Sequence, residues 1–365
     1  MKQFNKGVEK MKVLYVTAEC WPFAKTGGLG DVMEELATAL SNFGVNTTVI
    51  TFKYDSMDAS IMTDTGIGCL VEIDNRSLPT KIYTAQNGKV TYYFLKIADL
   101  FGVEYAGDKF NYTVGLSEGT FKAIEALVKA GLMQKPQVLH ANDWPTALVP
   151  VFLKTKYKNH PLFKETAVVF SIHNPKHIGE IVHRDRFYNL GIEGRHWFGL
   201  AMKNSPDYFC PMRGAVFHAD KINAVSKTNR DEMFSYEHGG ELCEDYRARI
   251  SDFLGIGNGT DYSKWQPVSK EEKPLKKSLL QAKCGFVVDS NIPLIGMVAR
   301  IAQQKGVKNV IRAIERILFE TAGGIQFVYL GKGNQKDPYY WEAKAELEGL
   351  QSRWPQNVRY IGKYS

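Results

Sequence analysis

Three glycines, a lysine and an aspartate stand together in the segment KTGGLGD, residues 25–31, between an apolar run and a stretch with helical spacing. Free N–H groups at the start of a helix favour a phosphate. Gly27 and Gly28 would let a ligand approach the backbone closely. Lys25 would supply charge to a phosphate or a developing anion, and Asp31 suits hydroxyl groups. The spacing is neither that of a P-loop nor G-x-G-x-x-G, so a tight turn beside a solvated lysine is an equally good interpretation.

Two further segments place polar and aromatic side chains directly after short apolar runs. In HANDWPTA, residues 140–147, the side chains of His140, Asp143 and Trp144 suit sugar hydroxyls and ring stacking. Ligands gather at the carboxyl ends of strands in open α/β sheets. The alternative is that Trp144 belongs to the core and Asp143 caps a helix that begins at Pro145. In FSIHNP, residues 170–175, His173 suits either a ligand hydrogen bond or a satisfied buried position.

A pair of cations lies in ARIAQQKG, residues 299–306, after another apolar run. Arg300 and Lys305 together would neutralise a diphosphate leaving group, although such a pair alone is usually a solvated surface feature. The sequence has no serine nucleophile elbow, H-E-x-x-H motif or EF-hand loop. We therefore expect neither a metal ion nor a cofactor.

Composition narrows the class of protein. The 365 residues are enough for two domains, and 44% hydrophobic with 23% charged residues is ordinary for a globular protein. The net charge of +7 comes from scattered lysines and arginines, so we do not expect nucleic-acid binding. Five dispersed cysteines without a C-x-x-C pair favour a reducing compartment. No apolar run is long enough to span a membrane, and we expect a cytoplasmic protein.

The elements that would position these residues alternate between strands and helices. Strands are predicted over residues 12–17, 46–52, 89–96, 137–142, 166–173 and 221–226, and helices over residues 32–44 and 119–131. The pattern restarts with strands in 292–299, 324–331 and 357–362 and helices in 306–320 and 340–354. Strands separated by helices of this length indicate βαβ units and a parallel sheet.

We accordingly expect two doubly wound α/β domains. The predicted divisions are a polar N-terminal extension over 1–10, a first domain over 11–257, a linker over 258–291, and the first half of a second domain over 292–365. Three strands and two helices are about half of a nucleotide-binding fold, so the second domain is expected to be incomplete and to expose apolar surface.

In this order the motifs make the chain resemble the bacterial glycogen synthase and plant starch synthase family, which are retaining glucosyltransferases of the two-domain GT-B type. The motifs are KTGGLGDV, H-x-x-D-W-P-T-A, I-H-N, N-G-x-D-x-x-x-W-x-P from Asn258 to Pro267, and R-x-x-x-Q-K-G. The resemblance runs through the whole chain from Met11. It implies a Rossmann-like domain for an α-1,4-glucan acceptor and a second one for the nucleotide sugar.

The resemblance also implies roles for residues. The donor phosphates would be bound by Lys25, Gly27, Gly28, Arg300 and Lys305, and the residues at the reaction centre would be His173, Arg300, Lys305 and Asp31. The acceptor or other sugars would contact Asp31, His140, Asp143, Trp144 and Asn174. Glucose would pass from ADP-glucose or UDP-glucose to a non-reducing 4-hydroxyl with retention and without a metal ion.

Several positions differ from the family pattern. Asn142 replaces the middle histidine of H-x-H-D-W, and His177 and Ile178 stand where tyrosine and glutamine are usual. The family's E-P-C-G-L-T segment does not occur before Ser365, so we expect a truncated chain. Two alternatives therefore stand beside an active synthase. One is an inactive glucan- or nucleotide-sugar-binding remnant, and the other is a different GT-B transferase such as a sucrose-type synthase.

Overall fold

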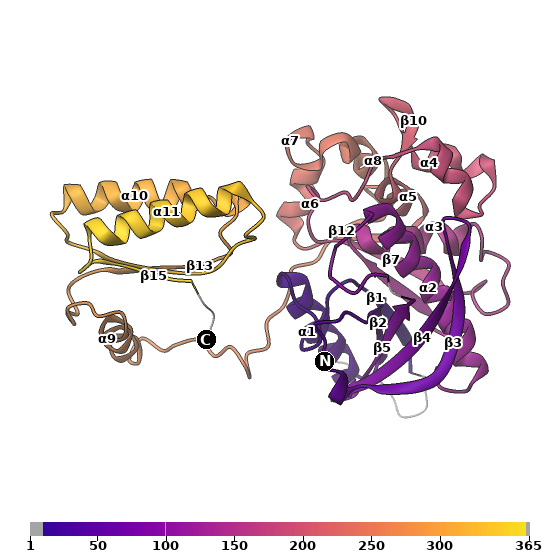
Figure 1. The fold of residues 1–365 in the computed structure, drawn as a ribbon, viewed down its shortest axis with the longest axis horizontal. Coiled ribbons are helices and arrows are strands. Elements are labelled where there is room, and N and C mark those ends of the chain that lie inside the picture. Colours follow the sequence, from indigo (N-terminus) through magenta and orange to yellow (C-terminus); the bar gives the residue numbers. More distant parts are fainter. Residues whose placement is uncertain (1–9, 99, 363–365) are drawn as a thin grey trace. The chain divides into compact units, whose positions relative to one another are not determined.

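A computed structural model describes residues 10–98 and 100–362 of the chain (Figure 1). These residues form two compact units, one that extends to Asp261 and one that begins at Tyr262.

The described part of the first unit is built on a nine-stranded sheet with the order β12-β11-β7-β6-β1-β2-β5-β4-β3. The strands from β12 to β5 run parallel, and β4 and β3 extend the sheet in antiparallel fashion. Their bounds are β1 Lys12–Val16, β2 Asn46–Phe52, β3 Thr63–Ile73, β4 Arg76–Asn87, β5 Val90–Ile97, β6 Val138–Asn142, β7 Ala167–Ile172, β11 Lys221–Ala224 and β12 Phe253–Gly255.

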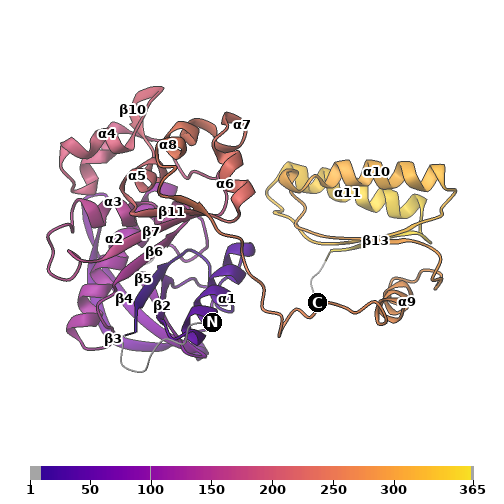
Figure 2. The same cartoon turned by 180° about the vertical axis from the view of Figure 1, so that it is seen from behind.

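Helices cover both faces of this sheet (Figures 1 and 2). They are α1 Gly28–Asn42, α2 Lys109–Lys129, α3 Leu148–Lys154, α4 Trp197–Leu200, α5 Pro211–His218, α6 Lys227–Met233, α7 Tyr236–Gly239 and α8 Cys243–Ala248. A small antiparallel sheet joins β8 Val182–His183, β10 Ser205–Phe209 and β9 Ala201–Met202.

Successive side chains of β5 point to the two opposite faces of the nine-stranded sheet. The ring of Phe94 lies 4.9 Å from that of Phe23, which precedes α1. The next residue, Leu95, points to the opposite face, because successive side chains of a strand alternate. There α2 approaches so closely that a Cβ on Gly119 would lie 2.9 Å from Leu95 Cδ1. The glycine therefore lets α2 pack directly onto β5.

The predicted parallel strands of the first unit are confirmed to within two residues. The predicted helix over 119–131 is confirmed as far as Lys129, but it covers only the second half of α2. The helix already begins at Lys109, where the Asp108 side chain accepts the N–H of Asn111 at 2.8 Å. Residues 112–121 are buried without a break, so the first half of α2 lacks the alternation that marks an amphipathic helix. The hairpin of β3 and β4 was not predicted.

The described part of the second unit has a parallel sheet with the order β13-β14-β15. Its strands are β13 Leu294–Val298, β14 Gln326–Leu330 and β15 Val358–Ile361, and its helices are α9 Lys273–Lys283, α10 Val307–Glu320 and α11 Pro338–Arg353. Helices α10 and α11 cover one face and α9 lies by the other (Figures 1 and 2).

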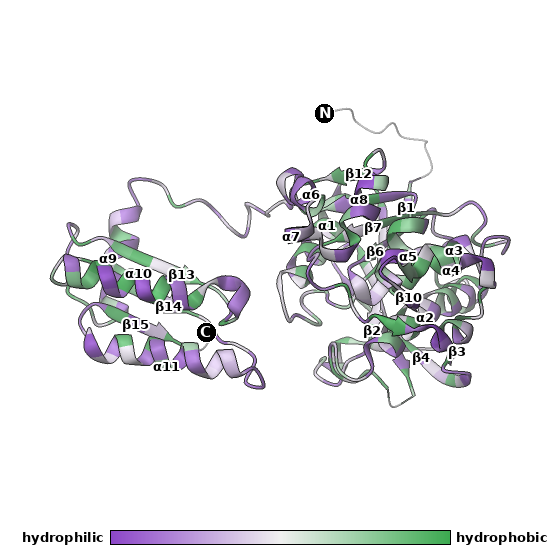
Figure 3. Ribbon diagram, turned by 90° about the horizontal axis from the view of Figure 1, so that it is seen from above, coloured by the Kyte–Doolittle hydropathy of each residue, from purple (hydrophilic) through white to green (hydrophobic). Residues whose placement is uncertain are grey.

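Helix α10 alternates between apolar and polar residues along its length (Figure 3). Val307, Ile311, Ile314 and Leu318 form its buried stripe. On the opposite face of the three-stranded sheet, the Gln281 amide of α9 donates to Oε1 of Gln326 in β14 at 2.8 Å. Helix α9 thus lies within the range 258–291, and its Gln281 hydrogen-bonds to β14 of the second unit. In β13, which is an edge strand of the described sheet, 71% of Val298 is exposed.

A nearly buried ion pair joins α5 to α8 in the first unit. The Arg213 guanidinium donates to both carboxylate oxygens of Asp245 at 3.1 Å and to the carbonyl of Phe198 at 2.7 Å. Because the Arg213 side chain is only 11% exposed, Asp245→Ala should leave a buried charge unpaired and lower the free energy of unfolding by about 3–5 kcal/mol. The neighbouring Glu244 is 65% exposed, so Glu244→Ala should change stability by less than about 0.5 kcal/mol. Urea titrations of both variants measure the difference, and equal midpoints would contradict it.

Candidate functional site

The predicted site residues of the first unit follow three neighbouring parallel strands. Strand β1 pairs with β6, where Tyr15 is opposite His140, and β6 pairs with β7, where His140 is opposite Val169. The carboxyl ends of these strands therefore meet at one edge of the sheet, where open α/β sheets bind ligands. The loops that follow β1, β6 and β7 carry Lys25, Asp143 and His173 to this edge.

A buried carboxylate organises the loop after β1. Glu19 is 4% exposed, and its Oε2 accepts the N–H groups of Thr26 at 2.8 Å and Gly27 at 2.7 Å. Its Oε1 accepts the hydroxyl of Tyr105 at 2.5 Å. The N–H of Gly27, which we expected to face an anion, thus donates to an internal carboxylate. Helix α1 begins at the next residue, Gly28, where a Cβ would meet nothing within 4 Å.

Lys25 and Asp31 contact each other. The Lys25 ammonium lies 2.8 Å from Asp31 Oδ1 and 2.7 Å from Oδ2, and it stands 5.7 Å from the centre of the Trp21 ring. Both side chains of the pair are more than 40% exposed, and such pairs contribute about 0–1 kcal/mol. The close approach of this loop to α1 requires Gly30, because a Cβ there would lie 3.2 Å from the Ala24 carbonyl oxygen.

Asp143 fixes the loop after β7 to the end of β6. Its Oδ1 accepts the backbone N–H groups of His173 at 2.7 Å and Asn174 at 3.3 Å. Burial raises the pKa of Asp143 to about 7, against the lowering effect of these two N–H groups. Its backbone has φ 58° and ψ 180°, a region used almost only by glycine that costs of order 1–3 kcal/mol. The arrangement is maintained by the surrounding structure, which includes the bond from the Asp143 N–H to the Ser171 carbonyl.

The orientation of His173 is set by Asn142. The Asn142 amide nitrogen donates to the carbonyls of Val16 and His140 at 3.1 and 2.9 Å, so its oxygen remains to accept from His173 Nε2 at 3.1 Å. An amide oxygen can only accept, so this contact favours the neutral tautomer with its proton on Nε2 and leaves Nδ1 without one. Burial lowers the pKa of His173 to about 4, so the imidazole is neutral near pH 7. His173 is thus suited to hydrogen bonding without charge.

The other predicted sugar-binding residues have contacts inside the fold. His140 Nε2 bonds with Ser171 Oγ at 2.7 Å, and burial lowers the pKa of His140 to about 3. Trp144 is 9% exposed and packs against the rings of Tyr105 and Tyr112 at 5.8 Å. Besides its bond to Asp143, Asn174 accepts the N–H of Lys176 at 3.1 Å. The predicted sugar contacts of these three residues stay predictions.

In the second unit, Arg300 and Lys305 lie between β13 and α10. Both side chains are exposed, and neither forms an ion pair within the described part of the chain. Two glycines set the path of this segment. A Cβ on Gly331 would lie 1.9 Å from the Ala299 carbonyl oxygen, and one on Gly333 would lie 2.4 Å from that of Ile301. The backbone on both sides of Arg300 is therefore held against the segment after β14, and the two cations are free to bind an anion.

Within residues 10–98 and 100–362, no three His, Cys, Asp or Glu side chains gather as a metal ion would require. No helix of the same residues has the length and apolarity to cross a membrane.

Solved glycosyltransferases have the same fold as this chain. Starch synthase IV from Arabidopsis thaliana, solved with bound ADP and acarbose, matches with a TM-score of 0.83 and 25% identity, over 98% of this chain and 75% of that chain. Sucrose-phosphate synthase from Thermosynechococcus elongatus shares the fold with a TM-score of 0.57 and 14% identity, over 98% of this chain and 71% of that one. The shared fold places this chain among the glycosyltransferases of the GT-B class.

Residues 12–248 match the family described as starch synthase catalytic domain. Glycogen synthase 1 from Geobacter sulfurreducens is 31% identical over 91% of this chain and 69% of its own length, and glycogen synthase from Mycoplasma mobile is 30% identical over 97% and 75%. The chain belongs to the glycogen and starch synthase family, and its function is that of a glycogen or starch synthase. The family resemblance and the α/β GT-B fold predicted from the sequence are confirmed.

Sequence reasoning missed several residues that position the site. Glu19 was not considered, although a lone acidic residue that directly follows an apolar strand is a usable signal. Asn142 was noted only as a departure from the family pattern, and its bond to His173 depends on the pairing of three strands. Gly331 and Gly333 form a G-x-G after a strand, which indicates close backbone approach.

The buried carboxyl of Asp143 predicts a pH dependence of stability. Its pKa is about 7 in the folded protein and about 3.9 when unfolded, so the folded state binds the proton more tightly. The stabilisation by this proton is complete below about pH 4 and is lost as the pH rises through 7. Relative to Asp143→Asn, the wild-type free energy of unfolding should fall by up to about 4 kcal/mol between pH 4 and pH 8. Urea unfolding across this range measures it, and a constant difference between the proteins would contradict it.

The role of Glu19 is testable at single amides. In Glu19→Ala, the N–H groups of Thr26 and Gly27 lose a carboxylate acceptor. Hydrogen bonds to charged groups are worth about 1.5–3 kcal/mol, so their exchange protection should fall at least about tenfold. Hydrogen exchange followed by NMR gives the two rates. Glu35→Ala on α1 is the matched control, and equal protection in both variants would exclude this role for Glu19.

Proposed function

We propose that this chain transfers glucose from ADP-glucose or UDP-glucose to the non-reducing 4-hydroxyl of an α-1,4-glucan, with retention of configuration. The observation that carries the proposal is the match to glycogen synthases over nine-tenths of the chain. The bound ADP and acarbose of the Arabidopsis starch synthase support a nucleotide sugar and a glucan as the two substrates. The proposal includes no resident cofactor or metal ion.

The leaving diphosphate is the group that most needs stabilisation. Its departure develops negative charge, and preorganised cations aimed at such charge lower the barrier. Arg300 offers a planar fork of donors that matches a phosphate, and Lys305 adds a point charge five residues later in the same loop. We assign both to the donor diphosphate. Their exposure and the lack of an ion pair within the described residues support this assignment.

The first unit would contact the sugars. Neutral His173 keeps Nδ1 as an acceptor for a hydroxyl of the transferred glucose, while its backbone is fixed by Asp143. Asp31 would accept hydroxyl hydrogen bonds, and Lys25 would turn from Asp31 to a phosphate. Since an exposed ion pair contributes about 1 kcal/mol or less, this exchange of partners costs little.

Incorporation of labelled glucose into glycogen tests the proposed reaction. Purified chain supplied separately with ADP-[14C]glucose and UDP-[14C]glucose should transfer label to glycogen from at least one donor. Arg300→Ala should lower kcat by about 100-fold, the usual effect of removing one charge-stabilising donor. Arg312→Ala, at an exposed position of α10, should leave it unchanged. Glycogen binding without incorporation from either donor would contradict the proposal and favour a glucan-binding protein.

A further inference from the structure

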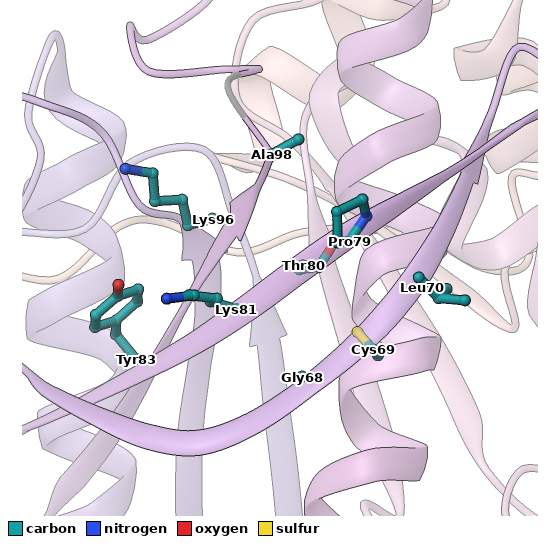
Figure 4. Close-up of a pocket in the computed structure, with 9 residues that line it drawn as sticks. All are labelled: Gly68, Cys69, Leu70, Pro79, Thr80, Lys81, Tyr83, Lys96 and Ala98. Atoms are coloured by element: carbon teal, nitrogen blue, oxygen red, sulfur yellow. The ribbon is translucent and has the colours of Figure 1, made fainter.

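The outer part of the large sheet carries a hollow of about 610 Å³ that the proposed reaction does not use. It lies over β3, β4 and β5, and its lining includes Gly68, Leu70, Pro79, Lys81, Tyr83 and Lys96. Figure 4 shows Lys81, Lys96 and Tyr83 gathered at one end, with both lysine side chains extended in the same direction. Its volume is in the range of small-ligand sites.

The strand register explains how the hollow forms. Lys81 of β4 is directly opposite Lys96 of β5 on one side and Gly68 of β3 on the other. Side chains opposite each other project from the same face, so the two lysines share it. Because Gly68 has no side chain, this face is open beside Lys81. Leu70 and Pro79, also opposite each other, form an apolar border, and Leu70 is 56% exposed.

The hollow is lined by two lysines whose positive charges have no carboxylate partner within the described residues. Like charges directly opposite each other on antiparallel strands are destabilising. A third ammonium, that of Lys53, stands 5.5 Å from the centre of the Tyr83 ring. None of these three lysines forms an ion pair with a carboxylate in residues 10–98 and 100–362. Lysines often protect the outermost strand of a sheet from pairing, but Lys81 and Lys96 lie on strands that are paired on both sides.

We propose that this hollow binds the phosphate group of a small organic phosphate monoester. A phosphate monoester carries a charge of about −1.5 to −2 near pH 7, which complements the facing ammonium groups of Lys81 and Lys96. The exposed side chain of Leu70 and the ring of Pro79 provide apolar contact for the organic part. The site is built from β3, β4 and β5 alone, and it does not depend on the proposed transfer reaction.

Methyl NMR of Leu70 reports on this site separately from any phosphate bound by Lys25, Arg300 or Lys305. The full chain with labelled leucine methyls is titrated with glucose 6-phosphate, with inorganic phosphate and with glucose. Glucose 6-phosphate should shift the Leu70 methyl signals in a saturable manner and bind about fivefold more tightly than inorganic phosphate, because its carbon atoms contact Leu70 and Pro79. Glucose alone should cause no shift, and added salt should weaken the binding.

Lys81→Met/Lys96→Met should lower the affinity for glucose 6-phosphate about tenfold. This variant is expected to fold, since it removes two facing like charges. Lys89→Met, an exposed lysine between β4 and β5, is the matched control and should bind as the wild type does. The proposal is overturned by absence of a saturable shift, by equal affinity for inorganic phosphate, by a response to glucose, or by unchanged affinity in the double variant.

Discussion

Buried carboxylates that accept backbone N–H groups are the interaction on which the site of the first unit depends. A loop folded against a sheet must find partners for its N–H groups once water is excluded. Glu19 provides them for Thr26 and Gly27, and Asp143 provides them for His173 and Asn174. Each carboxylate comes from the carboxyl end of one strand and fixes a loop that carries a predicted site residue. The positions of Lys25 and His173 are therefore set by the carboxylates of Glu19 and Asp143.

The free-energy cost of burying a charged side chain affects the protonation of the titratable groups in the first unit's site. Burial raises the pKa of Asp143 and lowers the pKa values of His140 and His173, so each of these groups moves toward its neutral form. The positive charge of Lys25 is paired with Asp31. These residues therefore bring less charge to the sheet edge of the first unit than they would in water. Arg300 and Lys305 of the second unit are exposed and form no ion pair within the described residues.

Local pattern was enough to predict the parallel strands other than β12, because buried strands of this kind are continuous runs of β-branched and aromatic residues. The three-residue strand β12 was not predicted. The β3–β4 hairpin was missed since its strands contain glycine, proline and several polar residues, and it gains its stability from pairing with β5. The motif residues were found because their types are unusual at strand ends. The role of Asn142 was not predicted because its three hydrogen-bond partners lie on three different segments of the chain. Such a role exists only once the sheet has formed.

The two units fix their ligand-facing loops by different physical means. In the first unit, side-chain carboxylates hold loop N–H groups, and these bonds depend on protonation and tolerate small shifts in distance. In the second unit, the segment around Arg300 is fixed by backbone contact with Gly331 and Gly333, where any side chain would overlap a carbonyl oxygen. Steric exclusion of this kind does not change with pH. An arginine that must meet a diphosphate in a fixed orientation gains from such a rigid support, because a planar guanidinium loses its bidentate geometry when its backbone moves.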